Sequence, residues 1–385
     1  MNKKVTKFGG SSLATAKNIL KAQAIVKSDS LRRFIVVSAP GKLPSNANCK
    51  NITVKNQDLE NTKVTDLLID AYTEMCSGKQ QENTSLSSLN KVITRFEKLA
   101  TELDIDIESE LERTIDEIDI NRCNRDFVVS RGEYLTAVLF AKLLNYRFVD
   151  ASKLIILNKN GRVNETKTQA KFEKFYNQID HTQGIVIGGF YGRGPDYKIK
   201  LMERGGGDYS GAIAATSINA KSYEVFTDTN GVQTANPAIV ANTQTISHID
   251  FSTLHKLAKG GASVIFPDCL PLLRRNNIPL VIDNTFNPHT NFTTVTQKKQ
   301  HGIFSQSYFS ITYTVQANVN KSTADILCIF NKIKFPYEIL KDLLKDFDVY
   351  ITSFKVGEFK LITNTKYSDL VIKKLHEYFA QFLSK

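Results

Sequence analysis

Residues 5–12 read Val5-Thr6-Lys7-Phe8-Gly9-Gly10-Ser11-Ser12, and this stretch does most to decide the fold. Its apolar residues predict a β-strand, and a helical segment begins near Leu13. Glycine lets a backbone approach a phosphate closely, and a helix N-terminus adds unpaired N–H groups. Gly-Gly-Ser-Ser is also good chemistry for a plain strand-to-helix turn. On this stretch alone, phosphate binding and a plain turn are equally good interpretations.

A second glycine-rich stretch covers residues 203–212 and reads ERGGGDYSGA. Three consecutive glycines are entropically costly unless a ligand approaches the backbone. The alternative is a flexible loop, but such loops seldom lead straight into a helix as apolar as the one that Ala212–Ala215 predict. We therefore favour a ligand-binding function for this stretch over a flexible loop.

Short β-branched runs and helical segments alternate along the first 300 residues. The predicted strands are Val5–Phe8, Phe34–Ser38, Phe127–Ser130, Arg147–Asp150, Gly184–Phe190, Tyr223–Thr227 and Pro279–Ile282. A helix is predicted at Asp66–Met75, whose apolar residues share one face. This alternation predicts an α/β domain in which helices sandwich a largely parallel sheet. Ligands bind such sheets beyond the carboxyl ends of the strands, where both glycine-rich stretches stand.

The residues after about His301 have a different pattern. Strands are predicted at Phe309–Gln316 and Ile326–Phe330, a helix at Tyr337–Phe347, a hairpin at Val349–Val356 and Phe359–Asn364, and a closing amphipathic helix at Ser368–Phe382. This pattern indicates a small α+β domain, so we expect two domains, 1–300 and 301–385. Within the first, the polar stretch Leu43–Asn61 is predicted to be a mobile insertion in a loop.

The composition is that of an ordinary soluble globular protein, with 42% hydrophobic and 23% charged residues. No apolar run approaches the ~18 residues of a membrane span and no secretory signal is recognisable, so we expect a cytoplasmic protein. The five cysteines are scattered without a CxxC pair, which argues against a disulfide framework and a zinc site. The net charge of +11 is spread along the chain, which favours a solvated surface over nucleic-acid binding.

Two familiar ATP-binding motifs are absent from the sequence. Asn124-Arg125-Asp126 resembles part of a protein-kinase catalytic loop, but the accompanying kinase motifs are missing. Gly41-Lys42 lacks the earlier glycine and the following hydroxyl residue of a Walker A loop. Any ATP site therefore belongs to another family.

Seven segments together resemble one such family, the aspartate kinases of the amino acid kinase superfamily. They are KFGGSS (7–12), VVSAPGK (36–42), KVTDLL (63–68), SRGE (130–133), RGGGD (204–208), FTDTNG (226–231) and GASVIFP (261–267). Each segment alone is weak evidence, whereas seven in the family's order are highly specific.

The resemblance implies transfer of the γ-phosphoryl group of ATP, with Mg²⁺, to the side-chain carboxylate of L-aspartate. The product is aspartyl phosphate, the entry to lysine, threonine and methionine synthesis. A carboxylate nucleophile is already ionised at pH 7, so the site has only to position the substrates and neutralise charge. The resemblance places Lys7 on the transferred phosphoryl group and Asp208 as the residue that orients this lysine.

The resemblance also implies which residues bind the two substrates. For aspartate they are Arg204 at the α-carboxylate, Glu133 at the α-ammonium group, and Ser38, Thr65 and Phe190 around the rest of the molecule. For the nucleotide they are Lys7, Gly9, Gly10, Ser11, Thr227, Asp228, Gln233, Ser263 and Val264. Taken singly, Glu133 is better explained as a surface residue and Thr65 as a helix N-cap, but the intact order of the motifs outweighs both.

The sequence departs from the family pattern at Gly207, Gln233, Ala238 and Ser263, where relatives commonly have serine, tyrosine, a basic residue and lysine. These changes remove one hydroxyl group from the substrate side and several contacts from the nucleotide side, which predicts weaker ATP binding. Two alternatives therefore stay open: a kinase for another small amino acid or carboxylate, and a catalytically weak regulatory or scaffold homologue.

The end of the chain departs further from the family pattern. Relatives usually carry two effector-binding ACT domains, whereas the 85 residues from 301 to 385 have room for one ACT-like module. We therefore expect a homodimer held by that module, with little inhibition by lysine or threonine.

Overall fold

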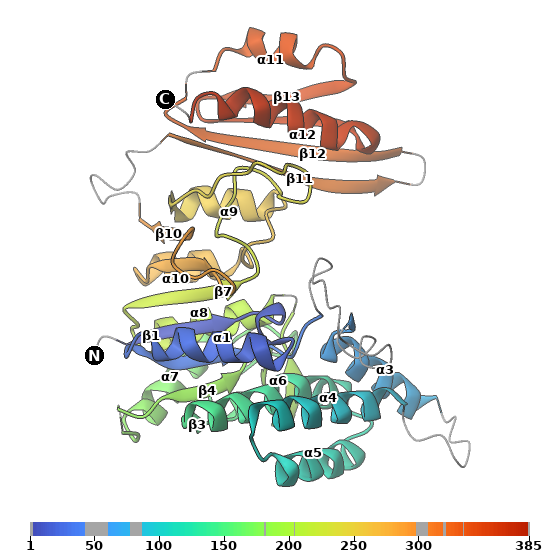
Figure 1. Ribbon diagram of the computed structural model, residues 1–385, viewed down its shortest axis with the longest axis vertical. Helices are drawn as coiled ribbons and strands as arrows, with labels where there is room; N and C mark the ends of the chain where they lie inside the picture. Colours follow the sequence, from blue (N-terminus) through green and yellow to red (C-terminus); the bar gives the residue numbers. More distant parts are fainter. Residues whose placement is uncertain are drawn as a thin grey trace. The chain divides into compact units, whose positions relative to one another are not determined.

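A computed structural model describes residues 3–42, 61–77, 87–180, 182–203, 205–297, 307–318, 321–333 and 335–383. The predicted insertion at Leu43–Asn61 lies outside these residues, apart from Asn61. The chain divides into two compact units, whose elements are labelled in Figure 1. Unit 1 comprises Met1–Asp228 and Asn284–Pro288, and unit 2 comprises Thr229–Asp283 and His289–Lys385.

Unit 1 is built on a parallel sheet. In its described part the strand order is β3 (Arg147–Phe148), β4 (Ile185–Gly188), β2 (Arg32–Val37), β1 (Lys4–Phe8) and β7 (Ser222–Thr227). Each neighbouring pair is parallel. The inner strands read as apolar runs because both faces of the sheet are covered. The predicted largely parallel sheet is thus confirmed, and β1 carries its glycine turn to the carboxyl edge between β2 and β7.

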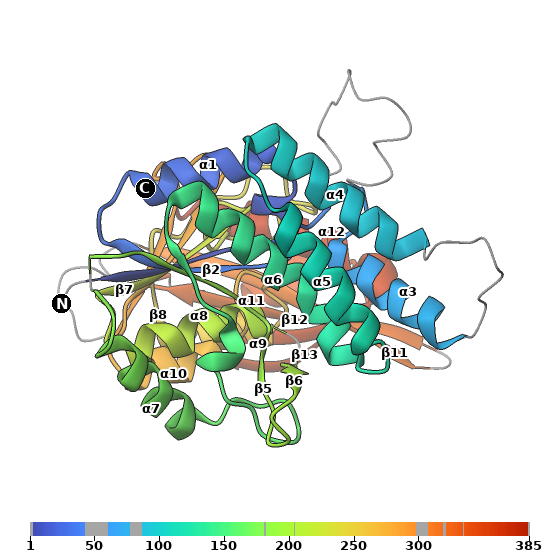
Figure 2. The same ribbon diagram turned by 90° about the horizontal axis from the view of Figure 1, so that it is seen from below.

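Helices lie on both faces of this sheet, as predicted. Figure 2 shows α1 (Ala16–Lys27) and α6 (Arg125–Leu144) on one face, and α7 (Glu165–Tyr176) and α8 (Gly206–Ser217) on the other. The remaining elements of unit 1 are α3 (Val64–Cys76), α4 (Ser87–Leu103), α5 (Glu108–Ile120), 3-10 turns at Ser11–Leu13 and Ala151–Lys153, and a hairpin of β5 (Tyr191–Arg193) and β6 (Ile199–Leu201).

The run Phe127–Ser130, which we predicted to be a strand, lies in the first turns of α6. The helix begins after Asn124, whose side-chain oxygen accepts a hydrogen bond of 3.2 Å from the Phe127 N–H. Because α6 is buried on nearly every side, its sequence has no polar face with a 3.6-residue period. A short apolar run from such a helix cannot be distinguished from a strand by its pattern.

Unit 2 contributes two sets of paired strands in the described residues. In the first, β10 (Thr293–Thr296) pairs in parallel with β8 (His248–Asp250) and antiparallel with β9 (Leu280–Asn284). The second is antiparallel, in the order β11 (Tyr308–Asn318), β12 (Lys321–Asn331), β14 (Glu358–Asn364) and β13 (Val349–Lys355). The helices of unit 2 are α9 (Phe251–Lys259), α10 (Cys269–Arg275), α11 (Tyr337–Leu344) and α12 (Thr365–Ala380).

A phenylalanine-rich core holds the second sheet against α11 and α12. The rings of Phe309, Phe330 and Phe359 pack around Phe379 of α12, with ring centroids 5.4, 5.8 and 6.2 Å from it. Such pairs stabilise by more than the area that they bury. The ACT-like α+β module predicted for the end of the chain is therefore confirmed as a fold.

This core continues into the segment that follows residue 228. Ala235 and Val240 are buried in the same cluster as the phenylalanines of the module. Thr234 is fully buried, and its hydroxyl lies 2.9 Å from Nε2 of His376 in α12. The module and residues 229–283 therefore belong to one compact unit. The predicted boundary at residue 300 between a catalytic and a regulatory domain stays a prediction. In the described part of the chain, no helix is both long and apolar enough to cross a membrane.

Candidate active site

A lysine and an aspartate meet at the carboxyl edge of the unit 1 sheet. Lys7 is the fourth residue of β1, and Asp208 lies in the first turn of α8. Lys7 Nζ is 2.7 Å from Asp208 Oδ1, and the two side chains are 12% and 17% exposed. A charge-assisted pair of this length fixes the ammonium group in place while leaving it in reach of a ligand. The structure therefore brings together the two predicted catalytic residues.

Two glycines keep space open beside this lysine. A Cβ atom at Gly9 would lie 3.9 Å from Lys7 Nζ, and one at Gly207 would lie 3.6 Å from Lys7 Cε. Neither glycine has a positive φ, so backbone conformation does not account for them. The hydroxyl of Ser38 borders the same space, 3.4 Å from the Cβ position at Gly207. Bare backbone on two sides of a lysine suits a ligand that has to reach the amine.

The turn after β1 is packed backbone against backbone. A Cβ atom at Gly10 would lie 2.9 Å from the Ala39 carbonyl oxygen, and one at Gly41 would lie 2.6 Å from the carbonyl carbon of Gly10. The Gly41 N–H also donates a hydrogen bond of 2.8 Å to the Gly10 carbonyl. The turn that carries the predicted phosphate-binding N–H groups is therefore fixed by the turn that follows β2.

The helix after this turn begins later than the sequence indicates. Ser11–Leu13 form a 3-10 turn, and α1 begins at Ala16 rather than near Leu13. The reason is Thr15, whose hydroxyl accepts a hydrogen bond of 3.2 Å from the Asn18 N–H and so caps the helix.

Glu133 is a buried acid within α6. It is 5% exposed, and desolvation raises its pKa to about 7, against a hydrogen bond from the Ala39 backbone and the charge of Arg131. Among the described residues, its Oε2 has no hydrogen-bond partner. A buried carboxylate oxygen without a partner is costly unless a ligand supplies a donor or a cation. The interpretation of Glu133 as a surface residue is wrong.

A glycine inside α6 lets two other segments approach Glu133. A Cβ atom at Gly132 would lie 2.9 Å from Ala39 Cβ and 3.1 Å from Val64 Cγ1. Glycine inside a helix costs about 1 kcal/mol relative to alanine, so it needs a packing reason. Here the reason is that the start of α3 and the turn after β2 both pack against α6 at this point.

Of the other predicted aspartate-binding residues, Thr65 is the second residue of α3, whose N-cap is Lys63, so its interpretation as an N-cap is wrong. Phe190 has a left-handed backbone with φ of 72°, a strained conformation that often marks functional sites. Hydrogen bonds hold it there: its N–H donates to Ser210 Oγ at 3.1 Å. Arg204 lies outside the described residues.

The predicted nucleotide-binding residues are divided between the units. In unit 1, Thr227 ends β7 and its hydroxyl donates to the Asp228 carboxylate at 3.2 Å. In unit 2, Gln233, Ser263 and Val264 line one hollow of about 120 Å³. This volume is below the ~300 Å³ of a typical small-molecule pocket, so the hollow suits only part of a nucleotide.

No group of three or more His, Cys, Asp or Glu side chains in the described ranges is placed to hold a metal ion. Mg²⁺ does not require such a cage, because it usually binds one or two carboxylates together with substrate phosphates and water.

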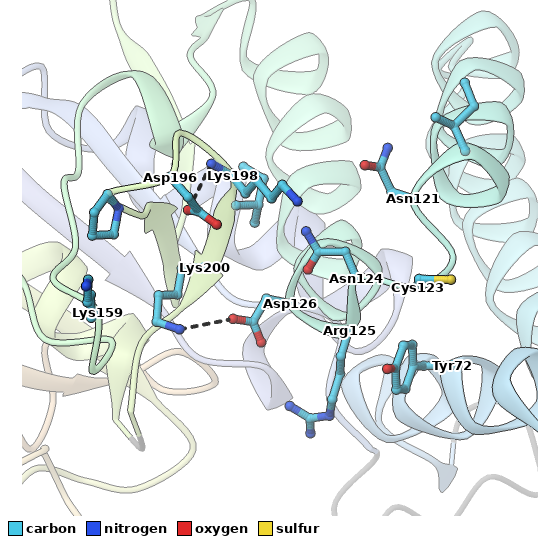
Figure 3. Close-up of a pocket in the computed structure, with 13 residues that line it drawn as sticks. Tyr72, Asn121, Cys123, Asn124, Arg125, Asp126, Lys159, Asp196, Lys198 and Lys200 are labelled. Carbon is cyan, nitrogen blue, oxygen red and sulfur yellow. Dashed lines mark hydrogen bonds and ion pairs between the residues drawn. The ribbon is translucent and has the colours of Figure 1, made fainter.

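A larger cavity, of about 690 Å³, contains none of the predicted site residues (Figure 3). It lies between α3, the start of α6 and the β5–β6 hairpin, and its charged lining residues are Arg125, Asp126, Lys159, Asp196, Lys198 and Lys200. Asp126 Oδ2 is 3.8 Å from Lys200 Nζ. Asn124-Arg125-Asp126, which resembles a kinase loop, thus caps α6 and lines this cavity. The sequence gives no signal for the cavity because its lining comes from distant segments.

Comparisons with known proteins agree on one family. The model of the "Amino acid kinase family" matches residues 2–284. Aspartokinase 3 of Bacillus subtilis is 31% identical over 340 residues, which are 83% of this chain and 70% of that protein. The aspartokinase of Chlamydia pneumoniae is 28% identical over 306 residues, 77% of this chain and 63% of that protein.

Two solved structures share the fold of almost the whole chain. The crystal structure of Clostridium acetobutylicum aspartate kinase has a TM-score of 0.77 and 23% identity, and the match covers 99% of this chain and all of that one. E. coli aspartokinase III, solved with aspartate and ADP, has a TM-score of 0.76 and 17% identity over 98% of this chain and 99% of that one.

Replacement of Gly206 or Gly207, the first two residues of α8, by alanine should have opposite effects on the stability of the protein. Gly207→Ala should leave stability unchanged or raise it by up to about 1 kcal/mol, because the site has room and alanine favours the helix. Gly206→Ala should cost about 1–3 kcal/mol, because its Cβ would lie 2.7 Å from Met202 Cβ and 2.9 Å from the Phe190 ring. Urea unfolding of both variants measures this difference, and equal stabilities would contradict the packing described above.

Proposed function

This chain belongs to the amino acid kinase family, in its aspartokinase group, and from that premise we propose that it transfers the γ-phosphoryl group of ATP to the side-chain carboxylate of L-aspartate. The observation that carries the proposal is the Lys7–Asp208 pair, with bare glycine backbone on two sides of the lysine. The buried, partly unsatisfied carboxylate of Glu133 supports an amino acid as the acceptor.

In the proposed reaction, an oxygen of the substrate carboxylate attacks the γ-phosphorus, and the bond to the β–γ bridging oxygen breaks as ADP leaves. No proton has to be removed, so Asp208 serves to hold Lys7 rather than to act as a base. The Lys7 ammonium group neutralises charge as it spreads over the phosphoryl oxygens, which is worth most in the transition state. The N–H groups of Gly10 and Ser11 are the proposed phosphate donors. The predicted third donor, the Gly9 N–H, is already engaged, because it donates a hydrogen bond of 3.0 Å to Phe226 O.

Glu133 is the proposed partner of the substrate's ammonium group. Burial makes its ionised form costly in the free protein, and an incoming cation would offset that cost. Arg204 would take the α-carboxylate as a bidentate donor, and Ser38, Thr65 and Phe190 would enclose the rest of the substrate.

Thr227, Asp228, Gln233, Ser263 and Val264 are the proposed nucleotide contacts, with Mg²⁺ brought by the ATP phosphates. One observation favours a weaker catalyst. Gln233 donates its side-chain amide to Asn230 O and Thr245 Oγ1 of its own loop, so this amide is already engaged. A catalytically weak homologue is therefore the second candidate.

Incubation with Mg-ATP and a panel of amino acids and other carboxylates, with hydroxylamine to trap acyl phosphates, tests these proposals. Aspartyl hydroxamate as the main product would support an aspartate kinase that feeds lysine, threonine and methionine synthesis in the cytoplasm. A different hydroxamate would identify a different acceptor. If no hydroxamate forms, the second candidate, a catalytically weak homologue, is the better interpretation.

Replacement of Lys7 should abolish turnover without unfolding the protein. Lys7→Met should lower kcat at least ~100-fold, because the lost charge acts mainly in the transition state. Lys4→Met is the matched control: Lys4 lies on the same strand and pairs with Asp29 and Glu224 at 2.8 and 2.7 Å. Steady-state kinetics should show normal kcat for the Lys4 variant, and near-normal kcat in the Lys7 variant would refute its role.

Binding of aspartate should weaken as the pH falls below about 7. The pKa of Glu133 is raised to about 7, so the free protein holds this side chain neutral at lower pH, and a neutral acid cannot pair with the ammonium group. The value of kcat/KM for aspartate should therefore fall about tenfold per pH unit below 7. In Glu133→Gln, kcat/KM should be lower and nearly constant from pH 6 to 8.

Stability gives a check on Glu133 that does not depend on activity. A raised pKa means that folding favours the neutral acid, so its contribution to stability is present below pH 4.5 and is lost as the pH rises through about 7. Glu133→Gln should therefore stabilise the protein more at pH 8 than at pH 5. The opposite order in thermal melts would show that the carboxylate is not desolvated.

We also propose a homodimer that pairs through the outer edge of β11 near Val315. The part of this edge nearer the start of β11 is already occupied, because the Ile311 N–H donates a hydrogen bond of 2.9 Å to Thr234 O. Val315 on this strand is 56% exposed, and Tyr350 on the other edge strand, β13, is 69% exposed. Val315→Lys should give a monomer by light scattering, because a charge at the contact blocks strand pairing, whereas Tyr350→Lys should stay dimeric. A dimer that resists Val315→Lys would place the contact elsewhere.

A further inference from the structure

Arg95 of α4 is one of the most deeply buried side chains in the described residues, although it carries a permanent charge. It is 2% exposed. A buried guanidinium group is costly unless its N–H groups are taken up by well-placed acceptors.

Those acceptors are main-chain carbonyls of three separate segments. Nη1 donates a hydrogen bond of 2.5 Å to the carbonyl of Thr62. Nη2 donates to the carbonyl of Ala14 at 3.2 Å and to the carbonyl of Gly41. A planar fork with fixed donor directions is the side chain best suited to hold three carbonyls at once.

Each of these segments leads to a residue of the proposed site. Ala14 follows the glycine turn that starts at Gly9, Gly41 ends the turn that starts at Ser38, and Thr62 precedes α3, which carries Thr65. The backbone ties the same segments together, since the Val64 N–H donates to Pro40 O at 3.0 Å and the Gly41 N–H donates to Gly10 O at 2.8 Å.

We propose that Arg95 is a positioning residue for phosphoryl transfer, which holds the glycine turn, the turn after β2 and the start of α3 in one arrangement. This inference rests on the proposed function, because it takes phosphoryl transfer as the reaction that depends on the arrangement. The hydrogen bonds from Arg95 to the three carbonyls, which we call the Arg95 clamp, do not depend on which reaction takes place. Arg95 touches no substrate, and acts by fixing the N–H groups and hydroxyls that do. Correct placement of such groups before the reaction is a large part of catalysis, and a shift of about 1 Å can cost about 100-fold in rate.

A purely structural arginine is the alternative, and Arg32 supplies the matched control. It is 3% exposed, and it donates to Ile25 O at 2.6 Å and to Glu224 Oε2 at 2.7 Å. Arg32 stands at the opposite end of β2 from Ser38, so its loss removes a buried guanidinium group without releasing the turns of the site.

The test compares Arg95→Met, Arg95→Lys and Arg32→Met with the wild type at a temperature where all are folded. For Arg95→Met we expect kcat/KM to fall about 10- to 100-fold, with KM raised for both ATP and aspartate. Lysine keeps the charge and some of the donors, so Arg95→Lys should recover part of this loss and supplies a second variant if the methionine protein does not fold. Arg32→Met should lower the melting temperature and leave both KM values unchanged.

Hydrogen exchange gives a second measurement that needs no activity. In Arg95→Met the amides of residues 9–14, 38–42 and 61–66 should exchange at least tenfold faster, while those of β2 and β4 should not change. Unchanged exchange in those three segments, or kinetic losses in Arg32→Met as large as in Arg95→Met, would overturn the proposal. If the wild type phosphorylates no substrate, the proposed function fails and the exchange data alone decide on the clamp.

Discussion

A Cβ atom at Gly10, Gly41 or Gly132 would come 2.9 Å or less from an atom of a neighbouring segment. Unit 1 depends on these close approaches, because they bring the turn after β1, the turn after β2 and the start of α3 against one another and against α6. Larger residues would separate main chains that carry the site. Space therefore explains these glycines, because none of the three has a positive φ.

Once the main chains are this close, the charges of the site are placed with little freedom. Lys7 is fixed by Asp208 on one side, and Glu133 is held in a buried helix with one oxygen unsatisfied among the described residues. A preorganised site of this kind costs no reorganisation when charge develops, but it makes the empty protein less stable than it otherwise would be. Arg95 offsets part of that cost, because its single side chain donates hydrogen bonds to three main-chain carbonyl oxygens.

Most of the fold, and the pairing of Lys7 with Asp208, could be predicted from the sequence, because strand and helix periodicities and ordered motifs are local signals. What could not be predicted depends on burial. The run Phe127–Ser130 resembles a strand because α6 has no exposed face and so no helical periodicity. Glu133 resembles a surface residue because glutamate is rarely buried in proteins. Arg95 has no motif at all, since its acceptors are carbonyls, which every residue possesses. The division into two units could not be predicted from the sequence either, because it depends on packing between segments that are distant in sequence.

The shared core of unit 2 limits how this chain can change in evolution. Ala235 and Val240 lie in the same cluster as Phe309 and Phe379, and the Thr234 hydroxyl shares a hydrogen bond with the His376 ring. A premature stop codon within the last module would therefore expose the segment that carries Gln233, rather than merely delete an appendage. Substitutions on the surface of this module leave the shared core intact, whereas a truncation would expose Ala235 and Val240 to water.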